Sequence, residues 1–311
     1  MTGLAFDLLL CVLILGTAIA AVAGRELFGS VVFYIVYGLL AAMAWVRLGA
    51  VDVALAEAAI GAGLTGVLVM GATARVARLA EHDVPDASRL ARMLAAAACA
   101  ALAGVIGHAV LAMDPAGAGL TELAESRLQE TGVGNPVTAV LLGFRAYDTL
   151  LESIVLLVAL IGVWSLAQDD HWGGVPGLPQ RVRADGVLAT FGRFLPPLGL
   201  VVGVYLVWAG ADQPGGAFQG GTVLAAVWLL LAMAALVRAP GVSSVPLRSA
   251  LVAGPALFLL AGVAGAAAGS FLGWPAAHAK TIIVGIEVGL TLSIAVTLAL
   301  LLMGPPQREE P

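Results

Sequence analysis

Residues 51–71 read VDVALAEAAIGAGLTGVLVMG, and Glu57 lies within this apolar stretch. Beyond Asp52 the run is otherwise nearly all apolar, and its length is typical of a helix that crosses a membrane. An ionisable residue inside such a helix is energetically costly, and it usually marks an ion or proton path. Glu152 and Glu287 repeat the pattern in two later apolar stretches. Ion handling is therefore the first hypothesis for this chain.

The composition indicates a polytopic membrane protein. Of the 311 residues, 60% are hydrophobic and 11% are charged, whereas a soluble domain carries about 25% charged residues. No basic tract suggests nucleic-acid binding. Cys11 and Cys99 lie in separate apolar stretches and form no CxxC cluster, so the sequence shows no iron–sulfur or zinc site. We expect no cofactor, and no metal beyond a transported cation.

Apolar stretches of sufficient length predict about nine membrane-spanning helices. The first stretch is long and has no basic leader before it, so we expect a membrane span there and not a cleaved signal peptide. The expected fold class is an all-α, multi-pass protein of the inner (plasma) membrane. The predicted spans are approximately 4–23, 28–46, 51–72, 91–113, 136–167 with a break, 194–211, 220–238, 248–271 and 279–303.

The distribution of basic residues predicts the orientation of these spans. Eleven of the 15 Lys and Arg residues fall in one set of alternate loops, and four fall in the other set. Cytoplasmic loops carry the excess of basic residues, so the richer set is expected inside the cell. This places the N-terminus outside and the C-terminus in the cytoplasm.

Two polar stretches divide the chain into three expected domains. Residues 114–135 form an acidic outer segment, and the Gly and Pro density of residues 168–193 argues against regular structure there. The expected domains are 1–113, 114–180 and 181–311, without a strict internal repeat. The 39 glycines permit close helix–helix packing in lipid.

Glu57 is the first candidate site residue. At 1.5 Å per residue it lies roughly 9 Å below the outer edge of its span, which begins near Asp52. Burial would tune such a carboxylate to accept a proton. The alternative is a structural acid paired with a Lys or Arg of a neighbouring subunit.

Arg145, Asp148 and Glu152 form a second candidate group, because spacings of three and four place them on one helix face. They could be a local ion pair that pins a helix start, or the mouth of a charge pathway. Asn135 and Pro136 before them predict a short half-helix followed by a break. Interrupted helices in membranes are tolerated where they line cavities.

Lys280, Glu287 and Thr291 share a face of the last span at spacings of seven and four. Lys280 and Glu287 could hand a charge inward along this face. The alternative is a salt bridge between subunits. His108 lies near the outer end of the fourth span, and a histidine side chain is a candidate for proton exchange. A lone histidine there is more often a satisfied interfacial residue.

The outer hairpin at residues 209–221 reads AGADQPGGAFQGG. Glycine permits unusual backbone angles and close approach. The Lys-Ser/Thr of a Walker motif is absent, so this is not a nucleotide loop. We expect a tight re-entrant turn that packs into a partner. The residues proposed for this packing are Pro214, Gly215, Gly216, Phe218, Gly220 and Gly221.

These motifs resemble those of a known family. Residues 1–80, with DVALAEAAIGAG, resemble the hydrogenase-subunit-like domain at the C-terminal end of the A subunit of Mrp-type multisubunit cation/proton antiporters. Residues 135–167 resemble the segment that follows it, whose pattern is close to FRxxDTxxE, and here the motif reads FRAYDTLLE. Residues 187–303 are similar to the B subunit, whose marker PGGGFQGG reads PGGAFQGG at 214–221.

The resemblance implies an all-helical, non-enzymatic membrane subunit of a Na⁺/H⁺ antiporter within a complex related to respiratory complex I. The implied partners are the other antiporter subunits, including a complex-I-like pumping subunit, together with Na⁺ or H⁺ and the bilayer. Glu57 and Glu152 would belong to the hydrophilic axis or cation path between subunits. The residues at matching motif positions are Asp52, Glu57, Asp148, Glu152, Pro214 and Phe218.

Two other functions remain open. The same modules occur in redox-driven, membrane-bound-hydrogenase-like complexes and in inorganic-carbon-uptake complexes, where this chain would be a coupling subunit. A structural scaffold without an ion path is a third hypothesis. The chain also departs from the family pattern. The long proton-pumping part of the A subunit is missing, and GIEVG places Glu287 where the B-subunit pattern has lysine in GxKxG.

Overall fold

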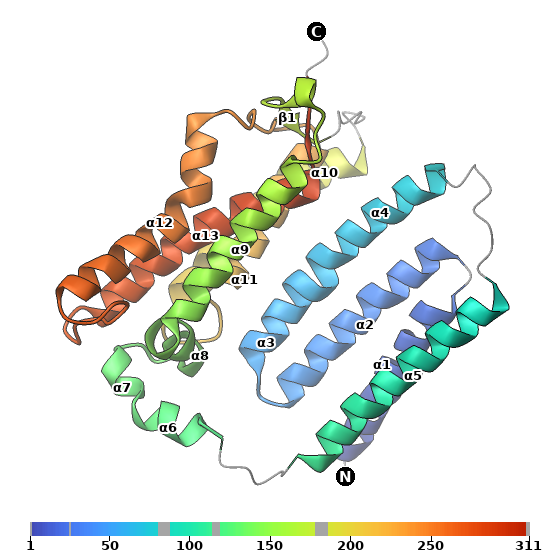
Figure 1. The fold of residues 1–311 in the computed structure, drawn as a ribbon, viewed down its shortest axis with the longest axis horizontal. Helices are drawn as coiled ribbons and strands as arrows, with labels where there is room; N and C mark the ends of the chain where they lie inside the picture. Colours follow the sequence, from blue (N-terminus) through green and yellow to red (C-terminus); the bar gives the residue numbers. More distant parts are fainter. Residues whose placement is uncertain (1, 25, 80–87, 114–118, 178–185, 309–311) are drawn as a thin grey trace.

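The chain folds as an all-α, multi-pass membrane protein. The computed structural model describes residues 2–24, 26–79, 88–113, 119–177 and 186–308 (Figure 1). Within these residues, eight helices are long and apolar enough to cross a membrane, and α11 (Ala217–Met233) is apolar but shorter. These helices lie at the positions of the predicted spans. The all-α fold class is confirmed, whereas the orientation in the membrane stays a prediction.

The N-terminal part of the chain is built around α2. This helix packs against α1 and against the continuous span formed by α3, the π-helix η1 and α4. No residue of α5 is buried within this chain. The elements are α1 (Thr2–Ala23), α2 (Leu27–Arg47), α3 (Val51–Ala56), η1 (Glu57–Leu64), α4 (Thr65–Leu79) and α5 (Arg89–Ala112).

Short helices at the end of the molecule near the N-terminus lead into the C-terminal part (Figure 1). They are α6 (Thr121–Ser126), α7 (Leu128–Thr131), α8 (Pro136–Ala139) and the π-helix η2 (Val140–Phe144). The remaining elements are α9 (Ala146–Trp164), η3 (Asp169–His171), β1 (Val175–Pro176), α10 (Val187–Ala209), α11, α12 (Val245–Ala267), α13 (Ala279–Met303) and β2 (Pro306–Gln307).

The central helix of the C-terminal part is α13, which packs against α9, α10, α11 and α12. Ile283, Ile286, Leu290 and Ile294 are each at most 1% exposed along it. Most other spans expose much of their apolar surface within this chain. Lipid or neighbouring subunits can cover that surface, whereas α13 is enclosed by its own chain.

Glycines let the helices around α13 approach closely. A Cβ atom on Gly254 of α12 would lie 2.8 Å from the Leu290 Cα atom and 2.9 Å from the Gly289 carbonyl oxygen. A Cβ on Gly221 of α11 would lie 2.8 Å from the Ile294 side chain. Such contacts are the usual role of small residues between membrane helices.

Two short strands pair at the end of the molecule near the C-terminus (Figure 1). β1 pairs antiparallel with β2, with Val175 opposite Gln307. The Val242 amide also donates a hydrogen bond to the Gly174 carbonyl at 3.0 Å. The described part of the Gly- and Pro-rich linker therefore contains short regular structure, contrary to expectation, because the C-terminal segment returns to pair with it.

Replacement of Gly254 by alanine tests the close packing of α12 on α13. The new methyl group meets backbone atoms that cannot rotate away, so we expect a loss of about 1–3 kcal/mol in stability. The control is Gly285→Ala on the exposed side of α13, where a Cβ meets nothing within 4 Å. The measurement is the thermal denaturation midpoint of the purified chain in detergent. Equal midpoints for the two variants would contradict the packing.

Candidate functional site

Asp52, in the first turn of α3, joins the two parts of the chain. Its side chain is buried, and its Oδ1 atom accepts a hydrogen bond from the Gly215 amide at 2.9 Å. The same oxygen accepts a 3.4 Å bond from the Asn135 Nδ2 atom. The Asp52 carbonyl accepts a bond from the Gln219 side chain at 3.3 Å. One residue therefore anchors the glycine-rich hairpin and the start of α8.

The hairpin between α10 and α11 is a tight turn that requires glycine. Gly215 and Gly216 have φ angles of +151° and +119°, which L side chains rarely adopt. The Leu206 carbonyl accepts hydrogen bonds from the amides of both Gly210 and Gly216, at 3.1 and 2.9 Å. These bonds close the loop, and they leave the Gly215 amide directed at Asp52.

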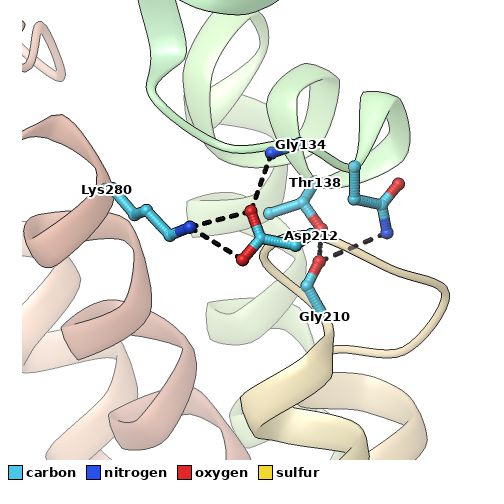
Figure 2. A network of polar contacts seen from close by, with 6 residues as sticks. Gly134, Thr138, Gly210, Asp212 and Lys280 are labelled. Atoms are coloured by element: carbon cyan, nitrogen blue, oxygen red, sulfur yellow. Dashed lines mark hydrogen bonds and ion pairs between the residues drawn. The ribbon is translucent and has the colours of Figure 1, made fainter.

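Asn135 supports this turn from α8. Its Nδ2 atom donates to the carbonyls of Gly210 at 3.2 Å and Gln213 at 2.9 Å, and its Oδ1 atom caps the Val137 amide. Thr138 donates to the same Gly210 carbonyl at 2.6 Å (Figure 2). Asn135 was expected to start a half-helix, but its links to Asp52 and the hairpin follow only from the fold.

Lys280 forms an ion pair with Asp212 and, among the described residues, none with Glu287. Its Nζ atom lies 2.8 and 2.7 Å from the two Asp212 oxygens, and the Gly134 amide donates to the same carboxylate at 3.2 Å (Figure 2). About half of each charged side chain is exposed. The hydrogen bond from Lys280 holds the pKa of Asp212 below its ordinary value. Sequence reasoning missed Asp212, because its partner lies 68 residues away.

Glu287 is the most enclosed carboxylate of the candidate set. The residue is 2% exposed, and its Oε2 atom has no hydrogen-bond partner among the described residues. Its Oε1 atom lies 3.0 Å from the position that a Cβ on Gly216 would occupy. The Thr291 hydroxyl donates to the Glu287 carbonyl at 2.7 Å and not to the carboxylate.

Glu57 is half-buried at the first residue of η1, which packs against α2 and α11. Its carboxylate occupies the space where a side chain at Gly61 would lie, so glycine at that position makes room for it. The Thr65 hydroxyl donates to the Ile60 carbonyl within the same wide turn. Such π-helical turns inside membrane spans are frequent at functional sites.

The second candidate group lies on the surface of this chain. Arg145 and Asp148 form an exposed ion pair at the start of α9, and Glu152 is exposed one turn further on. The predicted break before them is present as η2, and the Trp274 Nε1 atom donates to the Leu142 carbonyl inside it. His108 is exposed on α5.

The structure thus gathers some of the candidate residues and separates others. Asp52, Glu287 and the segment 214–221 meet where α3 and η1 contact α11. The segment packs within its own chain, where a partner had been expected. Within the described ranges, no group of three or more His, Cys, Asp or Glu residues is arranged to hold a metal ion.

Two protein families match separate parts of the chain. Residues 12–78 match the MbhD family, the D component of MBH, and residues 187–304 match the family described as a domain related to the MnhB subunit of Na⁺/H⁺ antiporter. A protein of Methanocaldococcus jannaschii, described as uncharacterized protein MJ1307, is 32% identical over 116 residues. This alignment covers 33% of the present chain and 44% of that relative.

Two solved membrane complexes contain similar chains. A chain of the Mrp complex from Dietzia sp. DQ12-45-1b matches 97% of this chain at 28% identity and a TM-score of 0.72. The present chain covers 35% of that longer chain. A chain of the archaeal membrane-bound sulfane sulfur reductase matches 68% of this chain, with 98% of its own length covered. Its 24% identity and TM-score of 0.54 show a shared fold.

Chains similar to this one therefore occur in large membrane complexes. This chain combines an MbhD-like region at residues 12–78 with an MnhB-like region at residues 187–304, and it is similar over nearly its whole length to a chain of the Mrp complex. The two regions meet at Asp52 and the 214–221 segment.

Replacement of Asp52 by alanine tests this junction. The change removes the acceptor for Gly215, and a hydrogen bond to a charged group contributes about 1.5–3 kcal/mol. We expect a lower thermal denaturation midpoint for the purified chain. Asp52→Asn keeps an acceptor oxygen and should lose less. An Asp52→Ala midpoint equal to that of the wild type would rule out the junction.

The Asp212–Lys280 ion pair predicts a defined pH dependence. Because the pKa of Asp212 is lower in the folded state, the pair stabilises the protein fully above the unfolded pKa, and this contribution is lost as pH falls through the folded value. Asp212→Asn should therefore lower the denaturation midpoint at pH 7. The difference from wild type should shrink as the pH falls below the ordinary aspartate pKa of about 3.9. A difference that grows on acidification would contradict this sign.

Proposed function

We propose that this chain is a membrane subunit of a multisubunit monovalent cation/proton (Na⁺/H⁺) antiporter. The observation that carries the proposal is the similarity of almost the whole chain to the Mrp complex, with both family matches in order along the sequence. In this proposal residues 1–113 form the A-subunit-like membrane domain. Residues 114–180 form the connecting segment, and residues 181–311 form the B-subunit-like domain.

The acids within the spans support a role in moving ions. Glu57 lies in a membrane span and, among the described residues, has no ion-pair partner. Its position at the start of η1 gives it a widened backbone turn. An intramembrane carboxylate of this kind can accept and release a proton as a cation passes. We assign Glu57 to the ion or proton path on these grounds.

The exposure of Glu152 on this chain supports a contact between Glu152 and another subunit. The residue lies six positions into α9, or roughly 9 Å along the helix, and its side chain is exposed on this chain. A carboxylate directed at lipid is costly, and such residues usually face protein or water. Another antiporter subunit would provide that environment and continue the path. A complex-I-like pumping subunit is the partner that the Mrp similarity favours.

A redox-driven complex is the second assignment to be tested. The similarity to the sulfane sulfur reductase concerns the fold. The antiporter assignment draws on a similarity that extends over nearly the whole chain. Purification of the native complex distinguishes the two: antiporter subunits should co-elute with this chain. Co-elution of hydrogenase or iron–sulfur subunits would instead assign the chain to a redox-driven complex.

Glu57→Gln tests the transport role directly. The amide preserves the shape of the side chain but cannot exchange a proton, so we expect Na⁺-driven proton flux to fall by at least about tenfold. The flux is measured in proteoliposomes containing the purified complex. Glu122→Gln, an identical change on the exposed helix α6, serves as the control and should retain normal flux.

Assembly must be measured beside transport for this variant. Equal subunit composition of the wild-type and Glu57→Gln complexes shows that any lost flux is a transport defect. Wild-type flux in a normally assembled Glu57→Gln complex would overturn the role of Glu57. Lost flux with lost assembly would assign Glu57 to subunit packing instead.

A further inference from the structure

The side chain of Glu287, on α13, is enclosed beside the start of α11. The residue is 98% buried, since only 2% of its surface is exposed. Its carboxylate lies against the Gly216 backbone, and the Ala217 amide is the backbone group that hydrogen-bonds to it. The second carboxylate oxygen, Oε2, has no partner among the described residues. A buried carboxylate with one unpartnered oxygen among the described residues therefore faces this helix start.

The charges around Glu287 do not neutralise an ionised carboxylate. Lys280, on the same helix, is paired with Asp212, and α11 carries no charged residue. Asp52 is close enough for its negative charge to oppose that of Glu287. The charged residues of the other helices that pack on α13 are Asp148 and Glu152 on α9, Arg193 on α10 and Arg248 on α12. None of these forms an ion pair with Glu287.

The surroundings fit a proton better than a metal cation. A desolvated metal cation requires several oxygen ligands around it. Among the residues that the structure describes, Oε2 of Glu287 has no hydrogen-bonding group, and the backbone group beside the carboxylate is the Ala217 N–H donor, which cannot bind a cation. A proton requires one oxygen only. Its binding removes the negative charge that burial and Asp52 both disfavour.

We propose that Glu287 is a proton-binding residue, held in its protonated form by its burial against the Gly215–Ala217 turn. This extends the proposed function, because it names H⁺ as the ion bound where the two regions meet. Binding adds one proton to a carboxylate oxygen, and release restores the negative charge. The protonation state of Glu287 is thereby linked to the hydrogen bond between the Gly215 amide of this turn and Asp52.

The glycine turn is the physical link between the two acids. Asp52 holds the Gly215 amide, whereas Glu287 lies against Gly216 and Ala217. An ionised Glu287 repels Asp52 across three consecutive residues, so release of the proton should loosen the turn or admit water. Both regions of the chain would respond, because Asp52 belongs to α3 and Glu287 to α13.

Infrared difference spectroscopy of the purified complex tests the protonation state. The difference between wild type and Glu287→Gln at pH 7 should contain the carbonyl band of a protonated carboxylic acid. The same subtraction for Glu122→Gln, which removes an exposed glutamate, should contain carboxylate bands. Loss of carboxylate bands in the Glu287→Gln spectrum would overturn the proposal, because Glu287 would then be ionised.

Hydrogen exchange tests the link to the turn. After correction for intrinsic exchange, protection of the 215–221 amides in wild type should fall several-fold as pH rises. In Glu287→Gln it should stay constant. The same pH-dependent fall in both proteins would refute the coupling. Neither measurement uses transport, so a complex without antiport activity would refute the proposed function while still deciding the protonation of Glu287.

Discussion

The hydrogen bond from the Gly215 amide to Asp52 is the contact on which the arrangement of the two regions depends. It holds a glycine turn between α10 and α11 against the start of α3, and Asn135 binds both sides of the contact. Because Gly215 and Gly216 adopt positive φ angles, the turn can present its amides outward. Asp52 binds one of these amides, and Glu287 lies against the following residues. The geometry of the helix packing thus sets the environment of a buried acid.

Burial acts differently on the acids of this chain. Glu287 is enclosed by its own chain, Glu57 is half-buried beside a π-helical turn, and Glu152 is exposed. In a bilayer the cost of a buried charge is offset differently for each acid. Glu287 can be protonated, Glu57 can face a polar path, and Glu152 can be covered by a neighbouring subunit. A protein that works inside a larger complex can leave such requirements to its partners. The similarity to a chain of the Mrp complex agrees with this division of roles.

The spans could be predicted from the sequence because long apolar runs have few alternatives in a membrane. The break before α9 was also predictable, from Asn135 and Pro136. The contacts of Asp52 were not, because Gly215 lies 163 residues away and no local pattern specifies that distance. The expected charge transfer between Lys280 and Glu287 was drawn from a shared helix face. In the structure Asp212 pairs with Lys280 instead.

The central claim is that Asp52 and Glu287 act as one unit across the glycine turn. A double-mutant cycle on Na⁺-driven proton flux, with Asp52→Asn, Glu287→Gln and both together in the reconstituted complex, tests this most directly. Residues that act together show non-additive effects. The double variant should be no slower than the slower single variant. Losses that multiply in the double variant would show that the two acids act independently, and would contradict the account.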